Sequence, residues 1–141
     1  MVEQALETCI CMDIRAAARR LTEIYDDALA PSGITVSQFS QLHKIQILNG
    51  PTFKELADAS GLDRSTLGRN IRVLEKLDLV GIQVGEDART RKIVITHKGR
   101  NAFKKAAPLW YGVQQARKST IGPVARNQLN ELLEKLTGVT E

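Results

Sequence analysis

The fold of this chain is decided by residues 52–96, TFKELADASGLDRSTLGRNIRVLEKLDLVGIQVGEDARTRKIVIT. Thr52 and Glu55 can form a capping box, in which each side chain satisfies a free amide of the other at a helix start. Gly61 permits a sharp turn after this short helix, and Asp63 has a side chain preferred for capping a second one. The pattern therefore predicts a helix, a tight turn and a second helix, followed by two strands.

The second helix has two chemically different faces. Its apolar residues recur every three or four positions and form an inward stripe of Leu67, Ile71, Leu74 and Leu77. The opposite face carries Ser65, Arg69, Arg72 and Lys76. Such a face suits the major groove of DNA, where Arg bonds guanine bidentately and Ser or Thr reaches phosphates or bases. We predict DNA contacts from these four residues and Thr66; the alternative is an ordinary solvated surface.

The two strands after this helix are predicted to form a hairpin. Val80, Ile82 and Val84 alternate with other residues, as in a half-buried strand, and residues 92–95 are a second, β-branched run. The polar segment between the strands contains Asp87, Arg89 and Arg91. A narrow minor groove attracts arginine electrostatically, so we expect Arg89 and Arg91 to face DNA and Asp87 to orient Arg89.

At this point the sequence resembles the MarR family of transcriptional regulators. The matching motifs are Glu55-Leu56-Ala57, Leu62 to Thr66, Leu74 to Leu77, Asp87 with Arg89, and Thr96 with Gly99. Asp78 stands where the family usually has glycine. The resemblance implies a mainly α fold with a small β-hairpin wing, a winged helix-turn-helix with long N- and C-terminal dimerisation helices. It also implies a homodimer that binds a double-stranded DNA operator.

Size and charge agree with a DNA-binding domain. The 141 residues suit a single domain, and the net charge is +4. Residues 1–50 hold six acidic and four basic side chains, whereas residues 51–100 hold ten basic and seven acidic ones. The basic surplus thus begins with the predicted helix-turn-helix. We find no secretory or membrane-spanning pattern and expect a cytoplasmic protein with no membrane contact.

Long helices are predicted on both sides of the DNA-reading unit. Ala5 to Ala30 has a heptad-like apolar stripe, and a helix of that length would span close to 40 Å, more than one small domain covers. Part of it is therefore expected on a second subunit, although a helix buried within one protomer has the same periodicity. We assign residues 1–30 and 100–141 to dimerisation and residues 35–98 to the winged helix-turn-helix.

Further helices are predicted inside these two regions. Thr35 to Leu48 is expected to brace the DNA-reading unit. A helix from His97 to Lys118, kinked at Pro108, should break at residues 121–123, and a last helix should end at Gly138.

Cys11 is a candidate redox sensor. The organic-hydroperoxide-sensing branch of the family carries a reactive cysteine in a sequence like LCFALYxASR, and residues 10–19, ICMDIRAAAR, are similar in layout. In that branch a tyrosine about four helical turns onward holds the thiol across the dimer, and Tyr25 stands at that position. The match is partial, because Val36 occupies the position of the branch's second tyrosine.

The chemistry around Cys11 permits two interpretations. Arg15 favours the thiolate that a reactive cysteine needs, whereas Glu7 opposes it. Cys9 and Cys11 would point about 200° apart on one helix, so a disulfide between them would require unwinding. Cys11 is either an oxidant sensor or a small residue packed in a helix interface.

The function expected from the sequence is that of a homodimeric repressor, released from a palindromic operator by thiol oxidation or by a small aromatic ligand. Trp110 and Tyr111 can line a pocket of the kind in which relatives bind aromatic acids, or they can anchor a helix. The alternatives to a DNA-binding regulator are a winged-helix protein-interaction module and a thiol-dependent peroxidase using Cys11. We expect no enzyme, cofactor or metal site, because no suitable catalytic or ligand pattern stands out.

Overall fold

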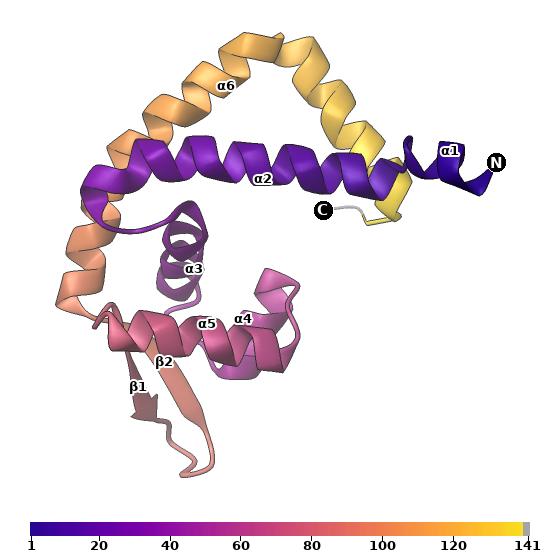
Figure 1. Cartoon of the computed structure of the whole chain (residues 1–141). Helices are drawn as coiled ribbons and strands as arrows, with labels where there is room; N and C mark the ends of the chain where they lie inside the picture. The colour runs from indigo at the N-terminus through magenta and orange to yellow at the C-terminus, as the bar shows by residue number, and fades with distance from the viewer. Residues whose placement is uncertain (140–141) are drawn as a thin grey trace.

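A computed structural model describes residues 1–139 of the chain (Figure 1). It is mainly helical with one two-stranded antiparallel hairpin, as the sequence predicts. The elements in chain order are α1 Val2–Leu6, α2 Ile10–Leu29, the 3-10 turn η1 Ala30–Ser32, α3 Val36–Ile47, α4 Phe53–Ser60, α5 Arg64–Lys76, β1 Val80–Val84, β2 Arg91–Ile95 and α6 His97–Thr137.

The helix-turn-helix consists of α4 and α5, and each begins at its predicted N-cap residue, but the predicted capping box at Thr52 is half formed, because within residues 1–139 the Glu55 side chain makes no hydrogen bond to the Thr52 amide. The Thr52 hydroxyl accepts a hydrogen bond from the Glu55 amide at 3.1 Å, and an Asp63 carboxylate oxygen accepts one from the Thr66 amide at 2.8 Å. Gly61 ends α4 with a φ of 66°, the left-handed conformation that glycine adopts without steric cost. The predicted positions of both helices are therefore confirmed.

The core lies where α3, α4, α5 and the base of the hairpin meet. Leu42, Leu56, Leu67, Ile71 and Ile93 are all fully buried. Burying each such side chain contributes about 1.5–3 kcal/mol to folding. This core fixes which face of α5 points outward.

One apolar position of α5 is exposed against expectation, and on α3 the structure decides between Ile45 and Ile47 for the apolar face. Leu77 was expected on the inward stripe, yet it is 41% exposed, because α5 ends at Lys76 and Leu77 is the C-cap residue. At the end of α3, Ile45 is buried and Ile47 is 66% exposed.

The hairpin pairs Val80 with Ile95, Ile82 with Ile93 and Val84 with Arg91. Val80 is buried, but Ile82 and Val84 are 37% and 60% exposed. The prediction of a half-buried strand is therefore wrong for its outer part. Figure 1 shows the reason, because the hairpin extends away from the helices that cover its base.

A tight joint connects the end of α5 with the start of α6. Asp78 has a φ of 60°, a conformation that aspartate tolerates better than most residues, which explains how it replaces the usual glycine. The Thr96 hydroxyl donates to the Asp78 carbonyl at 2.6 Å, and the Thr96 amide donates to the Leu79 carbonyl at 3.1 Å. A Cβ on Gly99 would lie only 2.1 Å from that Leu79 oxygen. The close packing of this joint therefore requires glycine at position 99.

The single long helix predicted from Ala5 to Ala30 is wrong at its start. α1 ends at Leu6, and α2 begins only after Cys9, whose extended backbone (φ −70°, ψ 112°) is that of an N-cap. The Thr8 hydroxyl donates to the Ala5 carbonyl at 3.1 Å. Thr22 and Thr120 make side-chain bonds to preceding carbonyls inside α2 and α6 without breaking them, so this bond does not explain the break, which the apolar stripe did not reveal.

The last helical region bends where the sequence predicts a break. α6 runs to Thr137, but Gly122 lies outside the helical region, with φ 78° and ψ 168°. Figure 1 shows α6 rising from the hairpin and then turning back, so that its two halves and α2 form an open frame above the DNA-reading unit. The sharp change of direction is at Gly122 and not at Pro108, which stays inside the helix.

Candidate DNA-binding interface

The outward face of α5 carries the predicted DNA contacts. Ser65, Arg69, Arg72 and Lys76 are all exposed, and Thr66 is half-buried. Within residues 1–139 the one ion pair closer than 4.0 Å lies on the hairpin, so no basic side chain of this face has a carboxylate oxygen that close. Cations without such partners are available to phosphates and base edges.

A chain of hydrogen bonds orders the start of this face. Asp63 Oδ1 accepts from the Thr66 amide, Asp63 Oδ2 accepts from the Thr66 hydroxyl at 3.0 Å, and Arg69 Nη2 donates to that hydroxyl at 3.3 Å. The bonds from the Thr66 amide and hydroxyl lower the pKa of the Asp63 carboxyl, and the Arg69 charge acts in the same direction. Thr66 therefore positions Arg69, a link that helical periodicity alone did not indicate.

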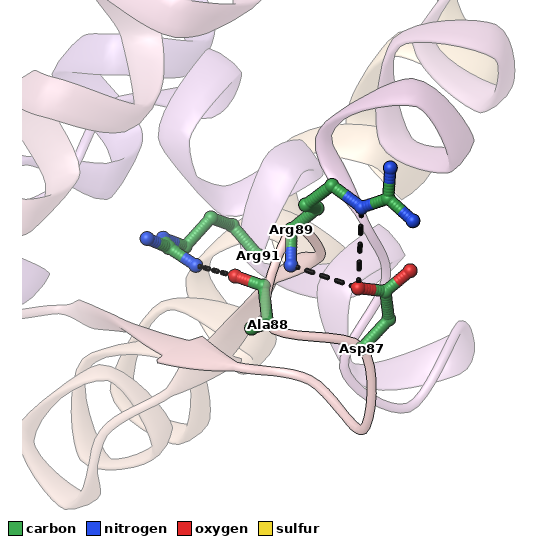
Figure 2. Close-up of polar contacts among 4 residues, drawn as sticks. All are labelled: Asp87, Ala88, Arg89 and Arg91. Carbon is green, nitrogen blue, oxygen red and sulfur yellow. Dashed lines mark hydrogen bonds and ion pairs between the residues drawn. The ribbon is translucent and has the colours of Figure 1, made fainter.

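The tip of the hairpin holds the other two predicted arginines (Figure 2). The Arg89 Nε lies 3.6 Å from Asp87 Oδ1, and the same oxygen accepts from the Arg89 amide at 3.0 Å. Arg91 Nη1 donates to the Ala88 carbonyl at 2.8 Å. The expectation that Asp87 orients Arg89 is confirmed, and Arg89 is 92% exposed at the end of the hairpin.

Two further residues of α5 belong to this surface and were not among the predicted contacts. Arg64 is exposed at the first position of the helix. Gly68 lies between the cationic positions, and a Cβ there would meet nothing within 4 Å. A glycine inside a helix costs about 0.5–1 kcal/mol relative to alanine, and here neither backbone angle nor packing requires it. A lone glycine between exposed arginines is the sequence signal that could have marked this position.

The outer helices expose a large apolar surface. On α2 it comprises Ile10, Ile14, Leu21 and Ile24, which are 39–56% exposed. Beyond Gly122, α6 adds Val124, Leu129, Leu132, Leu133 and Leu136, which are 37–70% exposed. We call these nine residues the outer apolar face. Exposed apolar surface of this extent is typical of an interaction site.

The candidate sensor residues do not meet within one chain. Cys11 is exposed on the first turn of α2, and residues 11 and 25 are separated by about 21 Å along a helix. The Tyr25 hydroxyl donates to Gln114 Oε1 of α6 in the same chain. Cys9 is half-buried outside the helix, so the premise that both cysteines lie on one helix is wrong.

A cavity of about 660 Å³ lies between α3 and the first half of α6. Trp110 and Tyr111 both line it, and Trp110 also stacks on Phe39 with ring centroids 5.8 Å apart. Trp110 is thus at once a helix anchor and part of a cavity wall.

The recognition helix α5, the basic hairpin and the long outer helices together define a winged helix-turn-helix DNA-binding protein. The family model described as MarR family matches residues 32–90. The chain belongs to the MarR family of transcriptional regulators.

Solved and curated relatives agree with this assignment. The M. tuberculosis transcriptional regulator MosR, in a crystal structure with DNA, is 42% identical, with a TM-score of 0.80 over 92% of this chain and 97% of MosR. S. aureus MepR, also solved with DNA, is 20% identical and shares the fold with a TM-score of 0.80 over 92% of this chain and 96% of MepR. YwoH of Bacillus subtilis strain 168, an HTH-type transcriptional regulator, is 27% identical over 92 residues, 65% of this chain and 67% of YwoH.

Among residues 1–139, no three His, Cys, Asp or Glu side chains are placed to hold a metal ion. In the same part of the chain no helix combines the length and the apolar character needed to cross a membrane.

Proposed function

We propose that the protein is a homodimeric repressor that binds a palindromic operator in the cytoplasm and leaves it on thiol oxidation or on binding a small aromatic ligand. Ser65, Thr66, Arg69, Arg72 and Lys76 would read the major groove of double-stranded DNA. Arg89 and Arg91 on the wing would enter the adjacent minor groove.

The homodimer proposal rests on the outer apolar face. Its exposed leucines and isoleucines lie on α2 and α6, on the frame to which each DNA-reading unit is attached (Figure 1). Pairing this face with that of a second chain would remove it from water, which stabilises association. A two-fold dimer would place two copies of α5 in successive major grooves roughly 34–36 Å apart. A palindromic operator follows from that symmetry.

Sedimentation of charged variants tests the dimer. Leu132→Asp, on the outer apolar face, should shift the dimer towards monomer and weaken operator binding at equal protein concentration. Ile47→Asp is a matched control, because Ile47 is 66% exposed on α3 and lies outside that face. An unmodified protein that stays monomeric at its DNA-binding concentrations and still binds the operator would contradict the homodimer.

Oxidation of Cys11 is the proposed redox signal. The thiolate sulfur would attack an oxygen of a hydroperoxide, forming an S–O bond while the O–O bond breaks and an alcohol leaves with the proton. Cys11 lies between Ile10 and Ile14 on α2, so the sulfenic acid would add a polar group beside the proposed dimer contact. An unsatisfied buried polar group costs about 1–3 kcal/mol, which a shift of the helices could relieve. Such a shift would change the separation of the two α5 helices and release DNA.

The role of Tyr25 depends on the same dimer. Its hydroxyl is occupied by Gln114 within the protomer, so an assisting role would require the Tyr25 of the second chain to approach Cys11. If the Tyr25 hydroxyl acts on the Cys11 thiol, Gln114→Ala should free that hydroxyl and change the peroxide dose at which DNA is released. Tyr25→Phe removes the hydroxyl and should change the same dose only if the hydroxyl acts on the thiol.

Cysteine variants test the redox signal directly. Cys11→Ser should bind operator normally and ignore peroxide, whereas Cys9→Ser should still respond. Aromatic acids and amides are tested in parallel with the same variants. If Cys11→Ser and the unmodified protein lose DNA at the same peroxide dose, oxidation at Cys11 is wrong and control by a small ligand becomes the preferred account.

A further inference from the structure

A carboxylate of α2 holds the first amide of α3. Asp26 Oδ1 accepts a hydrogen bond from the Val36 amide at 2.8 Å, although the two residues are ten positions apart. Val36 is the first residue of α3, so its amide has no acceptor within that helix. The start of a helix also carries a partial positive charge, which a nearby aspartate stabilises. The bond therefore joins α2 to the N-terminal end of α3.

The helix α3 does not need Asp26 in order to begin, because it has a cap of its own. The Thr35 hydroxyl accepts from the Gln38 amide at 3.2 Å, and the Gln38 side chain accepts from the Thr35 amide at 2.9 Å. These two bonds form a complete capping box. The carboxylate from α2 is an addition to that box, and what it adds is a connection between two parts of the molecule.

Those two parts are the outer frame and the DNA-reading unit, residues 35–98. The helix α3 belongs to the second part, because Phe39 and Leu42 are buried in one cluster with Leu67 and Ile71 of α5. Along Ile10–Leu29, which the structure describes throughout, Leu29 alone is buried. One such contact at the end of α2 gives a pivot, whereas a second attachment about one turn earlier, at Asp26, fixes a direction.

The side of α2 that carries Asp26 is opposite to the outer apolar face. At 3.6 residues per turn, Asp26 lies about 120–160° around the helix from the α2 residues of that face. Figure 1 shows α3 on one side of α2, between α2 and the rest of the DNA-reading unit. In the proposed dimer the other side of α2 contacts the second chain. A change in the angle at Asp26 would therefore move each α5 relative to the dimer contact.

We propose that Asp26 is a positioning residue that fixes the angle between the outer frame and the DNA-reading unit, and thereby the half-site separation that the dimer accepts. The second part rests on the homodimer of the proposed function, whereas the angle within a protomer does not. Two inserted base pairs displace a half-site by about 7 Å and rotate it by about 70°. A dimer with a fixed angle cannot follow such a displacement.

Operators with altered spacing test the effect on DNA binding. The unmodified protein selects an operator from random DNA, and two base pairs are then inserted between its half-sites. The ratio of the affinities for the original and the lengthened operator should fall by about threefold or more in Asp26→Ala, because loss of a capping acceptor shifts equilibria by about 2–30-fold. DNA with a single half-site should bind all variants equally, because α5 and the hairpin are unchanged.

The same bond can be removed from its donor side. Val36→Pro deletes the amide hydrogen at the first helical position, where proline is well accommodated, and Thr35 already has the extended ψ of 166° that proline requires before it. This variant should lower the spacing ratio as Asp26→Ala does. The double variant should lower it no further, because both changes remove one interaction.

Two variants at adjacent positions separate the hydrogen bond from the charge. Asp27→Ala removes an equal charge from an exposed position of the same helix and should keep the spacing ratio. Asp26→Asn loses the charge but keeps an oxygen that can accept from the Val36 amide, so most of the ratio should remain.

Residual dipolar couplings measure the angle inside a protomer, whether or not the protein dimerises. The couplings of the amides in α2 and α5 should fit one common alignment in the unmodified protein and in Asp27→Ala. In Asp26→Ala the two helices should require different alignments, a result that a general loss of stability would not produce.

Three results would overturn the role of Asp26 in spacing: an unchanged ratio in both Asp26→Ala and Val36→Pro, an equal loss of affinity on every DNA including the half-site, or a lowered ratio in Asp27→Ala as well. If sedimentation shows a monomer, the homodimer of the proposed function fails and the dipolar couplings decide on the angle alone. A common alignment of α2 and α5 in Asp26→Ala would then overturn the positioning role.

Discussion

Replacing Gly99 with alanine should weaken the joint between α5 and α6. The new Cβ would lie 2.1 Å from the Leu79 carbonyl oxygen and 2.8 Å from Ile95 Cγ1, so the start of α6 must move away by about 1 Å or more to restore ordinary contact. Overpacking of this kind costs about 1–3 kcal/mol. The movement would also strain the two hydrogen bonds of Thr96 to the joint, each worth about 1 kcal/mol.

These terms predict a net loss of about 2–4 kcal/mol, since alanine regains up to about 1 kcal/mol of helix propensity. The melting temperature should fall by about 10 °C, measured calorimetrically at one protein concentration because a dimer's stability depends on it. Operator affinity should fall as well, because the joint holds α5 to the outer frame.

Gly112→Ala is the matched control for Gly99→Ala. Gly112 also lies inside α6, but a Cβ there meets nothing within 4 Å. Stability should rise by about 0.5–1 kcal/mol. A Gly99→Ala protein as stable as the unmodified one, with Gly112→Ala behaving as expected, would refute the steric argument.

Three further predictions concern the DNA-binding face. Arg69→Ala should reduce the free energy of operator binding by about 1–3 kcal/mol and relax the base preference at one position. Arg89→Ala should weaken binding to all DNA sequences alike and, in competition assays, reduce the slope of log affinity against log salt concentration by about 1. Unchanged binding by both variants, in folded proteins, would argue against the assigned face. Gly68→Ala should stabilise the free protein by about 0.5–1 kcal/mol. The same change should weaken operator binding if DNA lies close to α5 at residue 68. Unchanged operator affinity in a gel-shift titration would contradict such a close contact with DNA. Because the folded pKa of Asp63 is lowered, its contribution to stability should be present above the unfolded pKa of 3.8 and disappear as pH falls through the folded value. The stability measured by urea unfolding between neutral and acid pH should therefore depend less on pH for Asp63→Asn, and equal pH dependence of the two proteins would contradict this.

The sequence was sufficient for elements whose causes are local. Helical caps at Thr52 and Asp63 and the stripe of Leu67, Ile71 and Leu74 are fixed by residues within a few positions of each other, so both helices and the outward face of α5 could be predicted. The same periodicity failed at residues 7–9, where the helix is interrupted without any change in the spacing of the apolar residues.

Features that depend on distant residues could not be read in this way. The exposure of Val84 depends on how far the helices extend along the hairpin, not on the alternation within the strand. The cavity wall joins Phe39 and His43 of α3 to Phe103 and Trp110 of α6, and no local pattern indicates that these helices meet. Whether Cys11 senses oxidants stays a prediction, because it depends on a second chain.

The bond between Tyr25 and Gln114 has a consequence for the protein during its synthesis. It joins residues 89 positions apart, so α2 leaves the ribosome long before its partner on α6 exists. At about 5–20 residues per second the whole interval is about 4–18 s, of which only the last 18 residues, about 1–4 s, follow completion of the helix-turn-helix and wing. A nascent chain would therefore contain all of α5 before α6 is available to pair with another chain. Products truncated before α6 should bind DNA only as weak single units.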